Sequence, residues 1–223
     1  MPLFIIATPI GNLDDITLRA LETMKQVDYL ACEDTRRTIR LLGKFEIRTP
    51  LIAYNKDNER SGLARLLDLL EQGKKVGLVS NAGTPLISDP GYLLVREAGR
   101  RGIPVIPIPG PSSVTAALSA AGLPAHRFLF EGFLPKKPGA RNKILTALKH
   151  ERRTAVIFES PYRIHKLLDE MAAALGDREI VVGRELTKVF EEFHRGPISS
   201  VRAALKKSKG EFIVIVAGEH EPD

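Results

Sequence analysis

Four short apolar runs in this chain are each followed at once by residues that can bind or activate a small molecule. These segments hold hydroxyl, carboxylate, amide, arginine, glycine and proline residues, at positions 8–15, 33–37, 80–91 and 109–113. Ligands of open parallel sheets bind outside the carboxyl ends of the strands. If the apolar runs are neighbouring parallel strands, the four segments therefore form one ligand-binding edge.

Each segment also has a plainer structural interpretation. Residues 80–91 contain two glycines and two prolines, which suit either a rigid connector or a loop that brings backbone groups close to a neutral or zwitterionic ligand. Ser112 or Ser113 either caps the following helix or lets helix-terminal N–H groups meet a carboxylate or phosphate. Residues 33–37, Glu-Asp-Thr-Arg-Arg, are either a solvated helix start or an acid–arginine group that recognises phosphate or hydroxyl.

The motifs of common nucleotide and metal enzymes are missing from the sequence. It contains neither G-x-x-x-x-G-K-[ST] nor G-x-G-x-x-G, which disfavours nucleoside triphosphates and ordinary dinucleotides. The five histidines lack H-x-x-x-H and H-E-x-x-H spacing, so we predict no metal. No G-x-S-x-G nucleophile motif occurs, and Cys32, inside an apolar run, is predicted to be a buried core thiol.

Apolar runs and helical periodicities alternate along the chain. We predict strands at 3–7, 27–32, 76–79, 105–108, 154–158, 179–182 and 212–216, and helices at 18–24, 63–70, 92–98, 114–121, 164–175 and 199–207. This alternation with short connections predicts a parallel α/β architecture, and the second half repeats the pattern. Proline and glycine gather in residues 107–124, where we place the domain boundary. Residues 136–143 are predicted to be a basic, mobile loop.

Composition limits the classes of protein and of partner. The chain has 223 residues, 43% of them hydrophobic, which is typical of a globular protein of one or two domains. No run approaches ~20 apolar residues, so we predict no membrane-spanning helix. A single cysteine favours a reducing compartment, and we expect the cytoplasm.

Basic residues gather in four groups that suit phosphate contacts. The groups are Arg36-Arg37-Arg40-Lys44, Lys136-Lys137-Arg141-Lys143, Lys149-Arg152-Arg153 and Lys206-Lys207-Lys209, in a chain with a formal net charge of +6. Aromatic residues make up only 6% of the chain, and there is no tryptophan. A polyanionic partner is therefore more consistent with structured RNA or a ribonucleoprotein than with single strands.

Seven segments taken together resemble one family over nearly the whole chain. They lie at 8–16, 33–36, 83–91, 109–113, 130–135, 158–163 and 184–188, and include Thr-Pro-Ile-Gly-Asn-Leu-Asp-Asp-Ile, Gly-Thr-Pro-Leu-Ile-Ser-Asp-Pro-Gly and Phe-Glu-Ser-Pro-Tyr-Arg. The chain thereby resembles the ribosomal RNA small subunit methyltransferase I group of the tetrapyrrole-methylase-like, class III S-adenosylmethionine methyltransferase superfamily. Its enzymes methylate the ribose 2′-hydroxyl of a decoding-centre cytidine in small-subunit (16S) ribosomal RNA.

The resemblance implies two α/β domains, residues 1–113 and 114–223, with S-adenosylmethionine in the cleft between them, and a homodimer. It implies cofactor contacts from the loops after the first, third and fourth strands and from the C-terminal domain. These contacts are Pro9, Ile10, Gly11, Ser80, Ala82, Gly83, Thr84, Ile87, Ser112, Ser113, Val114, Phe158 and Glu159. The basic segments supply candidate contacts to ribosomal RNA, within the assembled small subunit, at Arg36, Arg37, Lys136, Lys137 and Arg141.

The hydroxyl that is methylated must lose its proton during or after attack. The candidate acceptors are Asp34, Glu185 and Lys188, and the lysine would need a lowered pKa or would instead bind phosphate. Relatives commonly have aspartate where this chain has Asn81, which removes a charge but keeps a hydrogen-bonding side chain. They often have histidines where this chain has residues 54–59, Tyr-Asn-Lys-Asp-Asn-Glu, and at Phe190, so a histidine base in 54–59 is excluded.

Two other functions compete with this interpretation. One is a methyltransferase of the same fold that acts on a small macrocycle or a protein, which the basic segments disfavour. The other is a non-catalytic RNA-binding module or assembly factor, which saturable S-adenosylmethionine binding would exclude.

Overall fold

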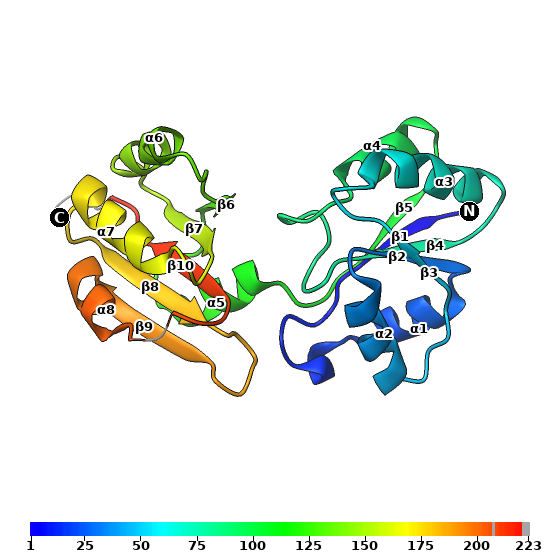
Figure 1. Cartoon of the computed structure of the whole chain (residues 1–223), viewed down its shortest axis with the longest axis horizontal. Helices are drawn as coiled ribbons and strands as arrows, with labels where there is room; N and C mark the ends of the chain where they lie inside the picture. Colours follow the sequence, from blue (N-terminus) through cyan, green and yellow to red (C-terminus); the bar gives the residue numbers. More distant parts are fainter. Residues whose placement is uncertain (207, 220–223) are drawn as a thin grey trace. The chain divides into compact units, whose positions relative to one another are not determined.

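The structure is a computed structural model that describes residues 1–206 and 208–219, so the predictions for residue 207 and His220 lie outside the described residues. It divides into two compact units, Met1–Ser112 and Ser113–Asp223, and each is described by itself. Figure 1 labels the elements of both units. The division falls one residue before the domain boundary expected from the sequence.

A five-stranded parallel sheet forms the centre of the first unit. Its strands are β1 (Leu3–Ile6), β2 (Tyr29–Cys32), β3 (Leu51–Ala53), β4 (Val76–Val79) and β5 (Val105–Ile108). They lie in the order β3-β2-β4-β1-β5, and every neighbouring pair is parallel. The chain leaves β1 toward β2 and leaves β4 toward β5, in opposite directions. The topological switch point, where such sheets bind ligands, therefore lies between β1 and β4.

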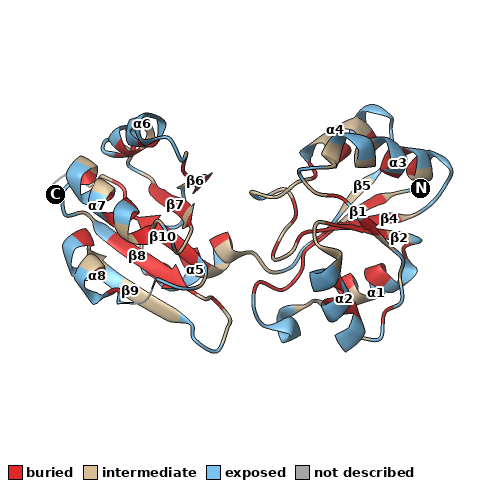
Figure 2. Ribbon diagram, viewed as in Figure 1, coloured by how far each residue is buried: buried red, intermediate tan, exposed pale blue. Residues whose placement is uncertain are grey.

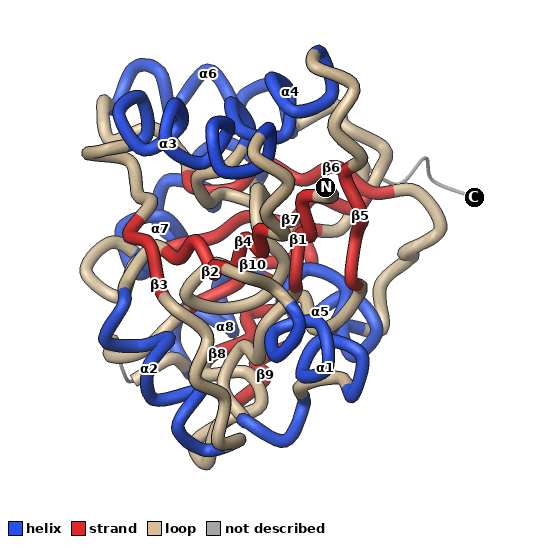
Figure 3. Tube along the Cα trace, turned by 90° about the vertical axis from the view of Figure 1, so that its right-hand side faces the viewer, coloured by secondary structure: helices blue, strands red, loops and turns tan. Residues whose placement is uncertain are grey.

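Helices cover both faces of this sheet. Leucines of α3 (Glu59–Glu71) and α4 (Tyr92–Arg100) pack on one face, with Leu3 and Leu78 of the strands. Apolar residues of α1 (Leu18–Gln26) and α2 (Thr35–Lys44) pack on the other face, with Ile6 and Val79. Figure 3 shows the two helix pairs on opposite sides of the strands, and Figure 2 shows the buried strands between them. A short 3-10 helix, η1 (Leu13–Asp15), precedes α1.

A second five-stranded sheet forms the centre of the second unit, and it is mixed. Its strands are β6 (Phe128–Phe133), β7 (Thr154–Glu159), β8 (Glu179–Arg184), β9 (Glu192–Pro197) and β10 (Phe212–Val216). They lie in the order β6-β7-β10-β8-β9, and only β6 and β7 are parallel neighbours. Helices α6 (Pro138–Leu148), α7 (Ile164–Leu175) and α8 (Ile198–Ala204) pack on one face, while α5 (Ser113–Ala121) packs against β10.

The structure corrects three expectations drawn from the sequence. The second sheet is mostly antiparallel, because β10 inserts between β7 and β8 and because β9 follows β8 directly. The segment predicted as a loop at 136–143 enters helix α6 at Pro138, since proline is well suited to the first helical position. Strands β3, β6 and β9 were not predicted, and a bulge between Phe130 and Gly132 interrupts the alternation in β6.

Two other predictions can be compared with the described residues. Cys32 is a buried free cysteine, as predicted, and burial raises the pKa of its thiol. Within residues 1–206 and 208–219, no helix is long and apolar enough to cross a membrane.

Candidate active site

The loops after β1 and β4 are joined at the switch point of the first sheet. Thr8 and Gly83 form an antiparallel bridge in which each backbone N–H donates to the other residue's carbonyl at 2.9 Å. The buried Thr8 hydroxyl lies 3.2 Å from the carbonyl oxygen of Ser80 and 3.4 Å from that of Gly83. The buried Ser80 hydroxyl lies 3.2 Å and 3.3 Å from the carbonyl oxygens of Ala82 and Gly83. Two hydroxyls thus fix the backbone of the β4 loop.

The loop after β5 reaches the same point. The Thr84 hydroxyl donates to the carbonyl of Pro111 at 3.1 Å. A Cβ on Gly83 would lie 3.3 Å from Ile10 and 3.7 Å from the Pro111 carbonyl, and Gly83 has a φ of +79°. The left-handed backbone therefore favours glycine at this position, and a Cβ there would also be tight against Ile10.

The predicted cofactor residues of the first unit surround this point. Pro9, Ile10 and Ser80 are buried, Ala82, Thr84 and Ser112 are half-buried, and Gly11 and Ile87 are exposed. Beyond Thr84, Leu86 and Ser88 have φ values of +74° and +69°. Left-handed conformations at non-glycine residues are strained and cluster at ligand-binding loops.

The amide oxygen of Asn81 is a candidate ligand-binding atom. It is buried and has no hydrogen-bond partner among the described residues. Because a buried acceptor without a partner costs free energy, a ligand that donates an N–H or O–H fits this position. The converging loops of the first unit therefore suit a small molecule with hydrogen-bond donors.

Carboxylates follow β2 and β4 at this edge of the first sheet. Asp34 caps helix α2 by accepting from the backbone N–H of Arg36 at 2.9 Å, as its plainer interpretation required. Asp89 lies near the end of the long loop after β4, three residues before α4 begins. Burial, with the nearby charge of Glu33, raises the pKa of Asp89 to about 6, despite the opposing effects of Ser80 and Lys56. In the sequence, Asp89 is only one of several polar residues in the 80–91 segment, and no pattern singles it out.

Glu185 and Lys188, at the turn between β8 and β9, form an ion pair. The Lys188 ammonium lies 2.8 Å from Glu185 Oε1 and 3.0 Å from Glu211 Oε2, and Glu211 N–H donates to the same Glu185 oxygen at 2.9 Å. Although burial lowers it, these bonds raise the pKa of Lys188 above its ordinary value. Burial raises the pKa of Glu185, but the bonds from Lys188 and from the Glu211 N–H outweigh this effect and lower the pKa below its ordinary value. Both groups are therefore held in their charged forms, which disfavours Lys188 as a proton acceptor.

Glu159 ends β7 and is buried in the second unit. Its Oε1 accepts from the backbone N–H of Ser160 at 2.6 Å and from the Arg163 guanidinium at 2.7 and 2.8 Å. Its Oε2 is buried and has no partner among the described residues. Phe158, the residue before it, packs edge-on against Phe130 and Phe133, with ring centroids 5.0 and 5.5 Å apart.

Residues 2–202 match the family model of Tetrapyrrole (Corrin/Porphyrin) Methylases. The chain belongs to the tetrapyrrole methylase family. Within this family it belongs to the ribosomal RNA small subunit methyltransferase I group. A protein of that name from Thermotoga maritima is 47% identical over 219 residues, which cover 97% of this chain and 98% of the relative. One from Mesorhizobium japonicum is 50% identical over 218 residues, which cover 96% and 74%.

Solved structures of other proteins share the fold of this chain. A diphthine synthase matches with a TM-score of 0.73 at 17% identity, over 97% of this chain and 90% of that one. The uroporphyrin-III-C-methyltransferase of Thermus thermophilus matches with a TM-score of 0.69 at 18% identity, over 97% and 94%. The predicted fold family and group are confirmed, and the chain is a methyltransferase.

The predicted RNA contacts of this tetrapyrrole methylase differ in their exposure to solvent. Arg36 and Arg37 are exposed in the first turn of α2, and Lys136 and Lys137 are exposed just before α6. Arg141 is only 4% exposed, and its guanidinium is bound to Glu170. Its assignment as a direct RNA contact is corrected, because its position in the first turns of α6 turns it inward.

The remaining predicted cofactor residues of this methylase lie in the second unit. Ser113 and Val114 begin α5, where Val114 is buried, and Phe158 and Glu159 end β7. No group of three or more His, Cys, Asp or Glu residues suited to a metal ion occurs within residues 1–206 and 208–219.

Proposed function

We propose that this methyltransferase transfers a methyl group from S-adenosylmethionine to the ribose 2′-hydroxyl of a cytidine in the decoding centre of small-subunit ribosomal RNA. The observation that carries the proposal is identity of 47–50% over nearly the whole chain to proteins named for small-subunit ribosomal RNA methylation. The exposed cations Arg36, Arg37, Lys136 and Lys137 support a polyanionic substrate.

The three loops of the first unit are the proposed contacts of the cofactor. In the first unit the proposed cofactor contacts are Pro9, Ile10, Gly11, Ser80, Ala82, Gly83, Thr84, Ile87 and Ser112. In the second unit they are Ser113, Val114, Phe158 and Glu159. The unpartnered Asn81 oxygen and the glycine at position 83 are features of this chain that fit such a ligand. When bound, S-adenosylmethionine supplies a methyl group already activated on a sulfonium.

The protein's own part in the reaction is to position the hydroxyl and to accept its proton. Correct alignment of reacting groups contributes up to ~7–11 kcal/mol in favourable cases. Of the three candidate acceptors we favour Asp34, since Glu185 and Lys188 are engaged with each other. Asp34 is half-buried, and only one of its carboxylate oxygens is used to cap α2. Proton acceptance by such a group contributes about 10²–10⁴-fold in rate.

The finer features of the substrate and the assembly come from the resemblance. We propose that the chain acts in the cytoplasm, as a homodimer, on the assembled small subunit. Sedimentation of the chain alone and with subunits tests both the dimer and the binding.

The test of the proposed function is a transfer reaction with S-adenosylmethionine labelled in its methyl group. Purified chain is mixed with small ribosomal subunits, and the label is counted separately in the RNA and the protein fractions. We expect salt-sensitive labelling of the RNA. Labelling of ribosomal protein, or of an added porphyrin-type macrocycle but not of RNA, would favour the rival methyltransferase. A chain that binds subunits but not S-adenosylmethionine would be a non-catalytic RNA-binding module.

A further inference from the structure

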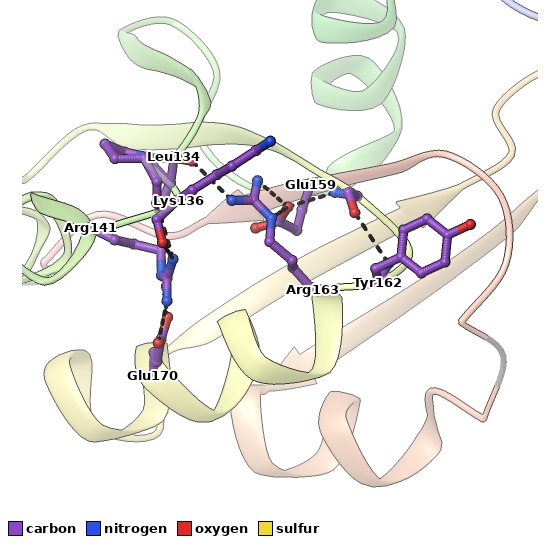
Figure 4. A network of polar contacts seen from close by, with 9 residues as sticks. Leu134, Lys136, Arg141, Glu159, Tyr162, Arg163 and Glu170 are labelled. Atoms are coloured by element: carbon purple, nitrogen blue, oxygen red, sulfur yellow. Dashed lines mark hydrogen bonds and ion pairs between the residues drawn. The ribbon is translucent and has the colours of Figure 1, made fainter. Parts of the chain in front are cut away.

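Two arginines hold three successive backbone carbonyls in the segment between β6 and α6. Arg163 Nη1 donates to the carbonyl of Leu134 at 3.3 Å. Arg141 Nη1 lies 3.0 Å from the carbonyl oxygens of both Pro135 and Lys136. We call these two guanidinium groups and the three carbonyls the arginine clamp, and Figure 4 shows it from close by.

Each guanidinium of the arginine clamp is held in turn by a carboxylate on or beside α7. Arg141 forms a two-pronged ion pair with Glu170, at 2.5 Å from Nε and 2.6 Å from Nη2. Arg163 binds Glu159 Oε1 through Nε and Nη2, at 2.8 and 2.7 Å. The Arg141 pair uses both carboxylate oxygens, and planar, two-pronged pairs of this kind fix orientation as well as charge. The segment is therefore attached to α7 through hydrogen bonds that a lysine cannot reproduce.

The arginine clamp leaves two cations on the outside. Lys136 and Lys137 are both exposed, and neither forms an ion pair among the residues that the structure describes. The first turn of α6 has no acidic residue to neutralise them. Inside, Glu170 and Glu159 balance the charges of Arg141 and Arg163, so the net charge of the segment is that of the two lysines.

We propose that Arg141 and Arg163 are positioning residues for RNA recognition, which hold Lys136 and Lys137 in place to bind backbone phosphates of the substrate. This inference rests on the proposed function and adds the means by which one basic segment keeps its shape. Ordering a lysine-bearing segment before binding lowers the entropy lost when the phosphates are bound. The arginines thus contribute to affinity without touching the RNA.

The test measures binding of small ribosomal subunits at several salt concentrations. Arg141→Lys keeps the net charge but loses the two-pronged bonds. Glu170→Gln raises the net charge by one, so simple electrostatics predicts tighter binding, whereas the proposal predicts weaker binding. We expect each variant to raise Kd about 10-fold. The plot of log affinity against log salt should become shallower by about one to two, since each lost phosphate contact reduces the size of its negative slope by ~0.7–0.9.

The matched control is Asp169→Asn on the same helix. Asp169 forms its own ion pair with Arg202 on α8, at 2.8 Å. Asp169→Asn removes one negative charge, so it changes the net charge by the same amount as Glu170→Gln. We expect no loss of subunit affinity from this control. S-adenosylmethionine affinity and Tm are measured for all variants, and kcat and KM are measured separately.

A double-mutant cycle separates positioning from general stability. In a chain that carries Lys136→Gln and Lys137→Gln, Arg141→Lys and Glu170→Gln should change Kd less than 2-fold, because the groups they position are gone. An undiminished effect there, or tighter binding by Glu170→Gln in the natural background, would overturn the proposal. If Arg141→Lys does not fold, Glu170→Gln carries the test. Subunit binding without methyl transfer would contradict the proposed function alone, and no binding at all would overturn both.

Discussion

At the scale of single residues, buried hydroxyls organise the proposed cofactor loops. Thr8 and Ser80 follow apolar strands, and from the sequence alone they resemble ordinary turn residues. In the structure both hydroxyls are turned inward onto carbonyls of residues 80–83. The shape of the loop after β4 therefore depends on hydrogen bonds that the residue types and their spacing in the sequence do not reveal.

Thr8→Val tests this dependence. It keeps the side-chain shape but leaves the carbonyls of Ser80 and Gly83 with one fewer donor, which should reduce the free energy of unfolding by about 1–2 kcal/mol. We expect S-adenosylmethionine affinity, measured calorimetrically, to fall about 10-fold. Thr154→Val is the control, since this buried hydroxyl donates to the Pro124 carbonyl at 2.6 Å in the second unit. Equal cofactor affinity in the Thr8 variant and the natural chain would contradict the role of Thr8.

Asp34→Asn tests the proposed proton acceptor. Asparagine caps helices as well as aspartate does, so α2 and the stability of the chain should be unchanged. We expect kcat to fall about 100-fold, with little change in S-adenosylmethionine affinity, because a general base contributes about 10²–10⁴-fold. Steady-state methyl transfer and calorimetry provide the two readouts. Full turnover by the variant would remove Asp34 from the mechanism.

Asp89 makes stability depend on pH in a direction opposite to that of a salt-bridged carboxylate. Its pKa is raised from 3.8 to about 6 in the folded chain, first by burial and then by Glu33. Between these values the folded chain binds a proton that the unfolded chain has released, so its contribution to stability falls as pH rises through this range.

Asp89→Asn should therefore stabilise the chain by about 1 kcal/mol at pH 7.5, after allowance for solvent screening. At pH below 3.8 the difference between variant and natural chain should disappear, since both then carry a neutral side chain. Urea unfolding of both proteins across this range measures the difference. A variant that is less stable than the natural chain at pH 7.5 would show that ionised Asp89 is a favourable partner in the fold.

At the scale of elements, hydrophobic patterns predicted four of the five strands and three of the four α-helices of the first unit, but missed β3 and α2. The stripe at 63–70 lies within α3, and the runs at 76–79 and 105–108 coincide with β4 and β5. Strand β4 is buried throughout, and buried parallel strands are continuous apolar runs that are easily recognised in a sequence. Strand β9, Glu-Phe-His-Arg-Gly-Pro, is half-buried and polar, so its sequence lacks this signal. Helix α6 begins with Pro138-Gly139, a pair that is also typical of turns.

The turn between β8 and β9 gives a prediction at this scale. Glu185 and Thr187 have φ values of +52° and +63°, and the Lys188 ion pairs hold the turn in this shape. Lys188→Met would leave the Glu185 carboxylate partly buried without its cation, which should lower the free energy of unfolding by about 1–2 kcal/mol. Chemical denaturation at pH 7.5 measures this. A 100-fold loss of kcat with unchanged stability would instead favour a catalytic lysine.

At the scale of the whole molecule, most of what the sequence predicts is carried by motifs in a fixed order along the chain. They predict the family and the α/β class, which the family model and the solved structures confirm. They do not predict the inserted position of β10 or the inward orientation of Arg141. Both depend on tertiary packing between segments far apart in the sequence, which local pattern does not encode.

The central claim is that the chain methylates a ribose hydroxyl of one cytidine, and nucleoside mass spectrometry tests it most directly. Small subunits from cells that lack this enzyme are incubated with the chain and methyl-labelled S-adenosylmethionine, and their RNA is digested to nucleosides. The account predicts label in 2′-O-methylcytidine, mapped to a single position in the decoding centre. Label on a base or on another nucleoside, or no label despite saturable cofactor binding, would contradict it.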